Sequence, residues 1–336
     1  MKVSRTVGLV LVFLLLVASV TAAGQLRKPG IDGAAFLKVG VGARIVALGS
    51  AATTIYGDPN QIFWNPAGIQ TDAGKTLVGL NYNDWLIDIQ HTAAAVTHGF
   101  GDLGSFGLGV IYMGLSDIAA DRDLAPPGYE QPVPETPGVG QYDSYNYYDL
   151  AVVLGYSKQF TDRFRMGLSA KYVRESIDDV AANAWAVDFG AVYETGFRDL
   201  TFGARINNVG SDLKFYAIPA SLPLNFSVGA SMSVAKEENT ALKAFVDLTK
   251  PKDSPQLYFI GGEWTIFDKL ALRGGYKFNY SGIQDKLTRL KQTDEGASFG
   301  AGLALPISGV NLWLDYAFTD FSVFENTHRF SLRFQF

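Results

Sequence analysis

The sequence of 336 residues contains no cysteine, only three histidines, and a small share of charged residues, 18%. The absence of cysteine excludes a disulfide framework, a thiolate metal site, a cysteine nucleophile and a lipidated N-terminal cysteine. Beyond the N-terminal region no apolar run approaches the roughly 18 residues that a membrane-spanning helix requires. The formal net charge of −5 argues against a general nucleic-acid-binding protein.

Chemistry that needs a cluster of reactive side chains is also poorly represented. His91, His98 and His328 lie far apart in the chain, and no serine or acidic residue stands at a spacing that favours a catalytic triad. Asp121 and Asp123 lack a third ligand at a recognised spacing. The sequence therefore predicts no enzyme, no metal site and no cofactor.

The N-terminus holds the one long apolar segment. Lys2 and Arg5 precede an apolar run over residues 7–20, and small residues follow at 21–24. A basic start, a short apolar core and a small-residue cleavage zone are typical of a secretory signal peptide. We predict a cleaved signal peptide over residues 1–23. An exported chain without a spanning helix can enter a membrane only as a closed barrel, because every backbone polar group must be bonded within lipid.

Residues 75–336 alternate polar and apolar side chains over many short segments. Phe164, Met166 and Leu168 fall on one face of a strand, and Arg165 and Lys171 fall on the other. The chain ends in the same way, with four apolar residues on one face: Phe330, Leu332, Phe334 and Phe336. Such alternation, with 13% aromatic residues, is typical of a barrel whose outer face meets outer-membrane lipid.

We therefore predict an all-β fold, an antiparallel transmembrane β-barrel of about fourteen strands in the bacterial outer membrane. The last strand is predicted to pair with the first, and its aromatic end to be read by the barrel assembly machinery. Short turns, as at 101–103 and 161–163, alternate with longer links at 118–143, 213–222 and 283–295. This alternation indicates short periplasmic turns and long extracellular loops. The predicted strands are 75–86, 90–100, 104–117, 144–160, 164–178, 182–195, 199–212, 223–235, 240–250, 256–267, 270–282, 296–307, 310–322 and 327–336.

Residues 25–74 lack the strand pattern. They are rich in glycine and alanine, and Asn65 before Pro66 has the features of a helix start, where Asn caps free N–H groups and Pro suits the first position. A barrel of this width cannot be filled by its own side chains alone. We predict that residues 25–74 form a small hatch, or plug, inside the barrel.

Short motifs follow one another in this segment: Gly42-Ala43-Arg44, then Leu48-Gly49, then Asp58, then Trp64-Asn65-Pro66-Ala67-Gly68. In this order they resemble the N-terminal signature of PorV/PorQ-type outer-membrane proteins, a family related to FadL-like transporters. The resemblance implies a barrel of about fourteen strands with an N-terminal hatch. Ile45-Val46 after the arginine, and an Asp58 without a second acidic neighbour, depart from the family pattern.

The predicted inner faces carry charges of both signs. We expect these charges to pair with one another and to hold the plug, because charges inside a barrel must pair or remain hydrated. The alternative is a polar ion pathway without strong selectivity. Arg44 is predicted to anchor the hatch to the wall, with Asp188 or Glu194 among its partners. The candidate lumen residues are Asp188, Glu194, Arg205, Asp247, Glu263, Arg273 and Lys277.

Two function classes remain open. Resemblance to PorV implies an accessory component of type IX protein secretion, with secreted proteins and a secretion translocon as partners. Tyr129 and Tyr142, in the long link, are its candidate extracellular binding residues. The relation to FadL implies passive uptake of a hydrophobic small molecule through a hatch-gated pocket and a lateral opening. Phe215 and Tyr216, in the link at 213–222, are the candidate extracellular residues for the entrance of that pocket. A kinked strand near the hatch would mark such an opening.

Overall fold

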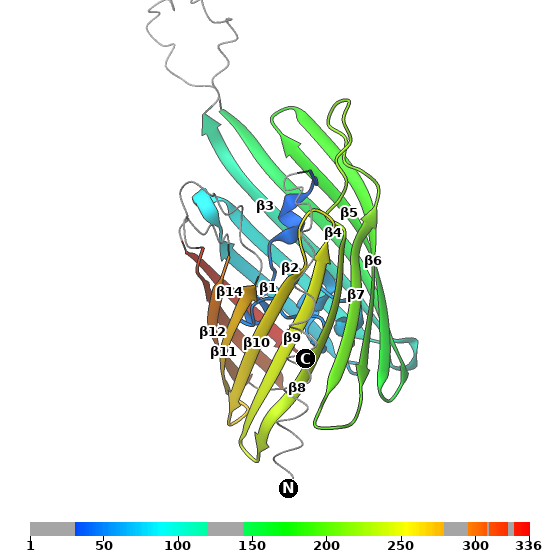
Figure 1. The fold of residues 1–336 in the computed structure, drawn as a ribbon, viewed down its shortest axis with the longest axis vertical. Helices are drawn as coiled ribbons and strands as arrows, with labels where there is room; N and C mark the ends of the chain where they lie inside the picture. The colour runs from blue at the N-terminus through cyan, green and yellow to red at the C-terminus, as the bar shows by residue number, and fades with distance from the viewer. Residues whose placement is uncertain (1–30, 120–143, 279–294, 308, 322–325) are drawn as a thin grey trace, which may run out of the picture.

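The computed structural model describes residues 31–119, 144–278, 295–307, 309–321 and 326–336. The expected signal peptide and the first residues of the expected hatch lie outside the described residues. The described part forms one closed antiparallel barrel of 14 strands, in which each strand pairs with its sequence neighbours and β14 pairs with β1 (Figure 1). The all-β fold and the closure of the barrel by the last strand are confirmed.

The strand bounds follow the predicted segments closely. The strands are β1 (Thr76–Asp84), β2 (Gln90–Gly99), β3 (Ser105–Ala119), β4 (Ser144–Thr161), β5 (Phe164–Ile177), β6 (Val180–Glu194), β7 (Thr201–Gly210), β8 (Asn225–Glu237), β9 (Thr240–Pro251), β10 (Leu257–Ile266), β11 (Leu270–Phe278), β12 (Ala297–Ile307), β13 (Val310–Thr319) and β14 (Thr327–Gln335).

Side-chain alternation decides which face of each strand looks inward. On β14, Arg329 and Arg333 are buried inside the barrel, whereas Phe330 is 54% exposed on the outside. Outward aromatic residues recur around the wall, for example Trp185 on β6 and Phe202 on β7. An outer face of this kind is suited to lipid and not to water.

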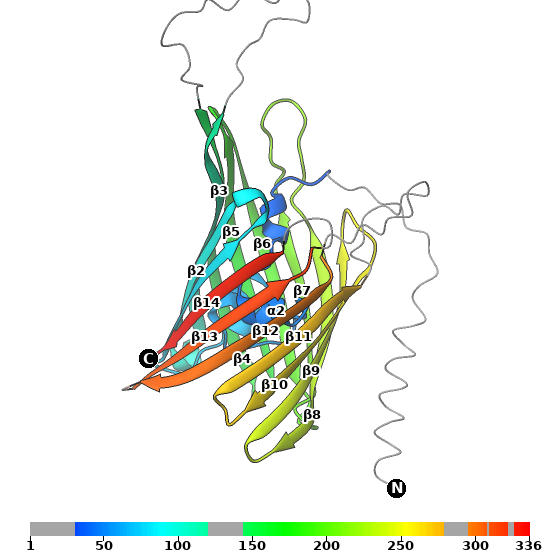
Figure 2. The ribbon, with the colours of Figure 1, turned by 90° about the vertical axis from the view of Figure 1, so that its left-hand side faces the viewer.

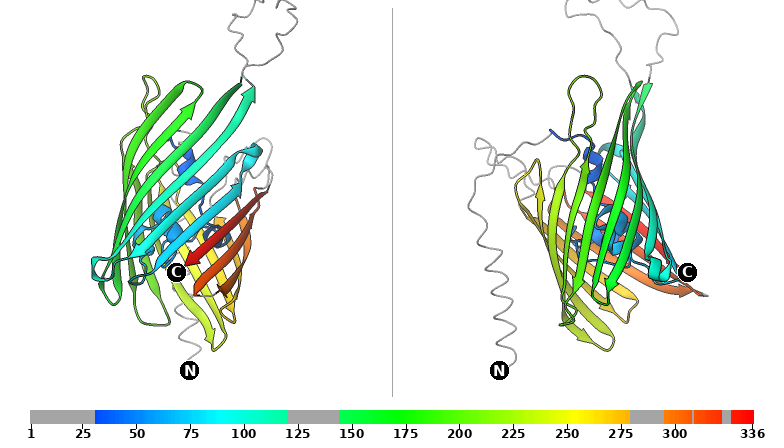
Figure 3. Two further views of the ribbon diagram at one scale, coloured as in Figure 1. Left: turned by 180° about the vertical axis from the view of Figure 1, so that it is seen from behind. Right: turned by 90° about the vertical axis from the view of Figure 1, so that its right-hand side faces the viewer.

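Two ends of the barrel can be distinguished by their connections. Tight connections join β2 to β3, β4 to β5 and β6 to β7 at one end, where β14 also finishes, and we call it the short-turn end. The longer links lie at the opposite, long-loop end, toward which β3, β4, β5 and β6 rise furthest (Figures 1 and 3). None of the helices in the described residues is long and apolar enough to cross a membrane, a finding that has no bearing on β-barrels.

Residues 31–75 precede the first strand, and we call them the plug segment; their short helices lie inside the barrel (Figure 2). The segment is built from short helices: η1 (Ala35–Lys38), α2 (Ala43–Ala47), η2 (Pro59–Phe63) and η3 (Pro66–Ile69). Two further helical turns, η4 (Leu86–Asp88) and η5 (Gly101–Leu103), belong to connections between strands. Ile45, Leu48, Ile62 and Ile69 of the plug segment have no exposed surface, so these residues act as a core for the barrel.

Candidate functional site

Glycines on the inner wall allow the plug segment to approach the strands closely. A Cβ atom on Gly203 of β7 would lie 2.5 Å from the carbonyl oxygen of Thr53, and one on Gly190 of β6 would overlap the side chain of Asn65. Only a residue without a side chain fits at such distances. The same holds around much of the wall, at Gly99, Gly167, Gly261, Gly275 and Gly300.

The Trp64–Gly68 motif fixes the turn at which the plug meets β4, β5 and β6. Asn65 caps η3, because its Oδ1 accepts a 3.1 Å hydrogen bond from the Ala67 N–H and Pro66 occupies the first position. Its Nδ2 also donates to the Thr53 carbonyl at 2.7 Å. The Ala67 carbonyl accepts from Ser157 Oγ at 3.1 Å, while Gly68 packs against the Ile55 carbonyl. The capping role expected of Asn65 is thus observed.

Asn65→Ala should destabilise the protein by about 1–3 kcal/mol, because it removes the cap and leaves a buried carbonyl without its donor. Thermal unfolding of the purified barrel in detergent measures this loss. Asn183→Ala, at an exposed position on β6, is the matched control and should stay within about 0.5 kcal/mol of the parent. Equal stability of both variants would contradict the capping argument.

The remaining hatch motifs are seated against the opposite wall. Gly42 adopts φ 90° before α2, and the Ala43 N–H donates to Ser331 Oγ at 2.7 Å. The backbone of Leu48 and Gly49 lies directly on β10 and β11. Trp64 donates from Nε1 to the Val41 carbonyl at 2.9 Å, and the Arg205 guanidinium lies 5.2 Å from its ring centroid.

A closed ring of ion pairs joins the plug segment to four strands. Arg44 contacts Glu263 of β10 at 2.9 Å and Asp58 at 3.8 Å. Glu263 contacts Arg273 of β11 at 2.7 Å, and Arg273 contacts Asp315 of β13 at 2.6 Å. Arg333 of β14 lies 3.1 Å from both Asp315 and Asp58, which closes the ring. We call Arg44, Glu263, Arg273, Asp315, Arg333 and Asp58 the charge ring.

The expected partners of Arg44 are therefore corrected. Arg44 does anchor the plug to the wall, but through Glu263 and not through Asp188 or Glu194. Burial by itself lowers the pKa of Arg44, yet Glu263 and Asp58 together raise it above its ordinary value. Asp188 instead pairs with Lys171 at 2.8 Å, and Glu194 pairs with Arg165 at 2.6 Å.

The other candidate lumen residues are also paired. Asp247 accepts from Thr53 N at 3.0 Å and Oγ1 at 2.6 Å, and Arg205 donates from Nε to the same hydroxyl at 3.1 Å. Arg205 and Asp247 are 4.0 Å apart. Lys277 contacts Glu295 at 2.5 Å. The charges of the lumen are thus paired with one another or bonded to the plug. This arrangement agrees with the expectation of paired charges that hold the plug, and not with a polar ion pathway.

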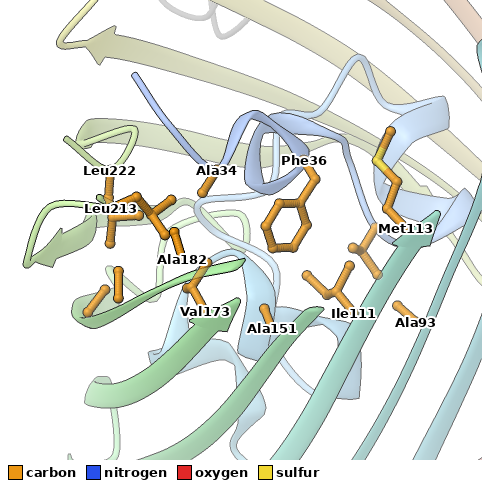
Figure 4. Close-up of a cluster of buried hydrophobic side chains, with 13 residues drawn as sticks. Ala34, Phe36, Ala93, Ile111, Met113, Ala151, Val173, Ala182, Leu213 and Leu222 are labelled. Atoms are coloured by element: carbon orange, nitrogen blue, oxygen red, sulfur yellow. The ribbon is translucent and has the colours of Figure 1, made fainter. Parts of the chain in front are cut away.

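An apolar cluster fills the lumen on the long-loop side of α2, and we call it the apolar chamber (Figure 4). Phe36 of η1 projects into it and is 2% exposed. Leu213 and Leu222 border it on one side and Met113 on the other (Figure 4). Its wall consists of small and apolar side chains: Ala93, Ile111, Ala151, Val173, Ala182, Ala184 and Ala186.

This chamber was not predicted from the sequence. A barrel lumen is ordinarily polar, so an apolar inner face looks like an ordinary lipid-facing one in the sequence. One signal was present on β6, where Ala182, Ala184 and Ala186 alternate with the exposed Trp185. A strand with alanine on one face and a large side chain on the other is the pattern from which the chamber could have been predicted.

The wall is irregular beside the chamber. The register of β6 and β7 shifts between Val187 and Phe189, so that Asn207 and Asn208 both lie opposite Asp188. Asn208 has φ 63° and donates to the Pro223 carbonyl at 2.9 Å, while Asn207 donates to the Trp64 carbonyl at 2.8 Å. The pairing of β7 with β8 reaches only to Asn207. Strand β7 is therefore distorted next to the plug, which is the feature expected of a lateral opening.

The candidate extracellular residues are placed in part. Phe215 is partly buried against the apolar chamber, while Tyr216 is 77% exposed. Tyr129 and Tyr142 lie outside the described residues. On the outer face of β14, Phe330, Leu332 and Phe336 are exposed, as the alternation predicts.

Comparisons with known proteins place the fold. Neither a family model nor the sequence of a curated protein matches this chain. Among solved structures, it is similar to the toluene transporter TbuX of Ralstonia pickettii (TM-score 0.57, 13% identity, 88% of this chain and 98% of that one). It is also similar to the Pseudomonas putida toluene transporter TodX (0.55, 13%, 88% and 97%) and to a Pseudomonas aeruginosa FadL homologue (0.53, 13%, 89% and 98%). At this identity the similarity concerns the fold alone, and that fold is the one of FadL-like outer-membrane barrels.

Proposed function

We propose that this protein is an outer-membrane channel for the passive uptake of apolar small molecules. The observation that carries the proposal is the apolar chamber, since a lumen that passes only water and ions has no need of an apolar interior. Binding pockets for small molecules are mostly apolar, with few polar groups. The solved relatives that share the fold include transporters of toluene, an apolar compound.

The irregular wall supplies an exit for the proposed ligand. The chamber ends at Leu213, Leu222 and Ala186, beside the point where β7 leaves its pairing with β8. The plug segment and the charge ring close the direct route toward the short-turn end. A ligand in the chamber would therefore leave sideways, past Asn208, into the lipid. Sideways exit suits an apolar molecule, because lipid solvates it better than water does.

The plug also controls occupancy of the chamber. Phe36 occupies the chamber in the structure, and η1 is held by a Lys38–Asp253 ion pair of 2.5 Å and by a hydrogen bond from the Gly33 N–H to the Ser221 carbonyl of 2.9 Å. Ser221 and Asp253 belong to connections at the long-loop end. A ligand that enters from that end would displace Phe36, and the movement would be transmitted to these connections.

Filling the chamber tests the proposal. Ala184→Trp places a large side chain inward from β6, whereas Ala181→Trp, three residues earlier on the same strand, places it on the opposite face. Fluorescence of naphthalene entering cells that express the barrel reports uptake. We expect Ala184→Trp to reduce uptake at least tenfold and Ala181→Trp to leave it unchanged. Equal uptake by the two variants would overturn the proposal.

The type IX secretion role is the second candidate, and it rests on the PorV/PorQ resemblance of the hatch motifs. None of the comparisons supports it, and Tyr129 and Tyr142 lie outside the described residues. Affinity capture of the barrel from native outer membranes separates the candidates. If secreted proteins and a translocon co-purify with the barrel, and the barrel takes up no naphthalene, the secretion role is favoured.

A further inference from the structure

Two buried charges of the described residues have no ion-pair partner within the described part of the chain. Among the buried Asp, Glu, Lys and Arg side chains of the described residues, every one takes part in an ion pair except Arg329 and Asp149. Arg329 is 2% exposed and Asp149 is 1% exposed. A buried charge without a partner is unfavourable, so a pair of such residues with opposite sign calls for an explanation.

The polar atoms of both residues are only partly used. Arg329 donates from Nη1 to the hydroxyls of Thr319 and Thr327, at 3.0 and 2.7 Å, while its Nε and Nη2 have no partner among the described residues. Asp149 accepts a short hydrogen bond from the Tyr147 hydroxyl, and its Oδ1 has no described partner. Each residue can therefore form further hydrogen bonds, Arg329 as donor and Asp149 as acceptor.

The two residues stand in one register row that runs across five neighbouring strands. The strand registers pair Arg329 with Asn83, Asn83 with His91, His91 with Met113, and Met113 with Asp149. Asn83 Oδ1 and His91 Nε2, both buried, also lack described partners. The row therefore carries unused hydrogen-bonding atoms along its length, from a cation at one end to a carboxylate at the other.

This row borders the apolar chamber. Ala93, Ile111 and Ala151 each lie two residues along the strand from a member of the row, on the same inward face and toward the short-turn end. Figure 4 shows Met113 beside Ile111 and Phe36. Trp85, which packs against the chamber, also covers Arg329, with the guanidinium 5.3 Å from a ring centroid. A ligand would have to displace Trp85 and Phe36 to reach both charges.

We infer that the chamber accepts an extended zwitterion with an apolar body, and a short apolar peptide with free ends is the form that fits. Its carboxylate would bind Arg329, its ammonium would bind Asp149, and its backbone would meet Asn83 and His91. Four strand spacings separate the two residues by about 19 Å along the wall. The inward side chains shorten this gap, and three extended residues span about 10 Å. This inference rests on the same apolar chamber as the proposed uptake function and goes beyond that function, because it adds to the apolar ligands a ligand with an apolar body and two charged ends.

Isothermal titration of the full-length barrel in detergent with trileucine tests the inference. N-acetyl-trileucine lacks the ammonium, and trileucine amide lacks the carboxylate. We expect either modification to weaken binding at least tenfold. A series of leucine peptides from two to five residues should show a maximum of affinity at one length. Equal binding of free and blocked peptides, or no binding of any, would overturn the inference without use of a variant.

Variants identify the residues that recognise each end. Arg329→Gln should lose the discrimination between trileucine and its amide, and Asp149→Asn should lose the discrimination between trileucine and its N-acetyl form. Arg198→Gln and Asp162→Asn, at exposed turn positions, are matched controls and should bind as the parent does. Discrimination that survives in both site variants would place the ligand elsewhere. Naphthalene uptake with no peptide binding would overturn this inference alone, whereas peptide binding with no naphthalene uptake would contradict the proposed function.

Discussion

Glu263→Ala is expected to destabilise the seated plug by about 3–5 kcal/mol, because removal of one partner from a buried ion pair leaves the others uncompensated. Glu263 holds both Arg44 of the plug and Arg273 of the wall, at 2.9 and 2.7 Å. Its loss opens the charge ring and leaves two guanidinium groups short of a carboxylate. Thermal unfolding should show a lower transition temperature, and planar bilayer recordings should show openings of high conductance that the parent lacks.

An exposed ion pair provides the control for this prediction. Lys236 and Asp199 are 3.2 Å apart, with side chains 66% and 52% exposed. Exposed pairs of this kind contribute less than about 1 kcal/mol, so Asp199→Ala should leave both unfolding and conductance near the parent values. A stability loss in Glu263→Ala no greater than in Asp199→Ala would show that the charge ring does not hold the plug.

Gly261→Ala should impair seating of the plug, whereas Gly262→Ala should not. A Cβ on Gly261 would overlap the carbonyl oxygen of Leu48 and lie 2.9 Å from its Cβ, while a Cβ on Gly262 meets nothing within 4 Å. The obstructing atom belongs to the plug backbone, so the plug itself must shift. Overpacking of this kind costs about 1–3 kcal/mol.

The two glycines are neighbours on β10, so any general effect of alanine in a strand is shared between the variants. The difference between their unfolding midpoints in denaturant therefore isolates the contact with Leu48. In Gly261→Ala, the plug should also be protease-sensitive in a small fraction of the molecules, which limited proteolysis from the short-turn side would detect. Indistinguishable midpoints would mean that the plug can move away from β10 at no cost.

The sequence was sufficient for the wall of the barrel. Strand alternation is a local property with a period of two, so each strand and its inward face can be recognised without knowledge of its neighbours. Arg273 and Lys277 were placed in the lumen on this basis, and Asn65 was identified as a cap from its position before Pro66. These features depend on residues adjacent in the chain.

Contacts that depend on the height of a side chain in the barrel, and on its position around the circumference, could not be predicted from the alternation. Arg44 was assigned Asp188 or Glu194, because the period shows that a carboxylate faces inward but not how far it lies from the plug. Glu263 reaches Arg44 only because Gly261 and Gly275 let α2 approach that side of the wall. The apolar chamber was missed for a similar reason, since Ala151 and Val173 have the same appearance whether they face lipid or a closed interior.

The glycine seats have a consequence for the order of assembly. The plug fits against β2, β5, β6, β7, β10 and β11 with no room for a methyl group, and the charge ring ties the same segment to β13 and β14. Threading this segment into a completed barrel would require it to pass along the described wall and then form all of these contacts from inside. We expect the strands to wind around the plug before the seam between β14 and β1 closes, with the plug as the template that sets the barrel's circumference.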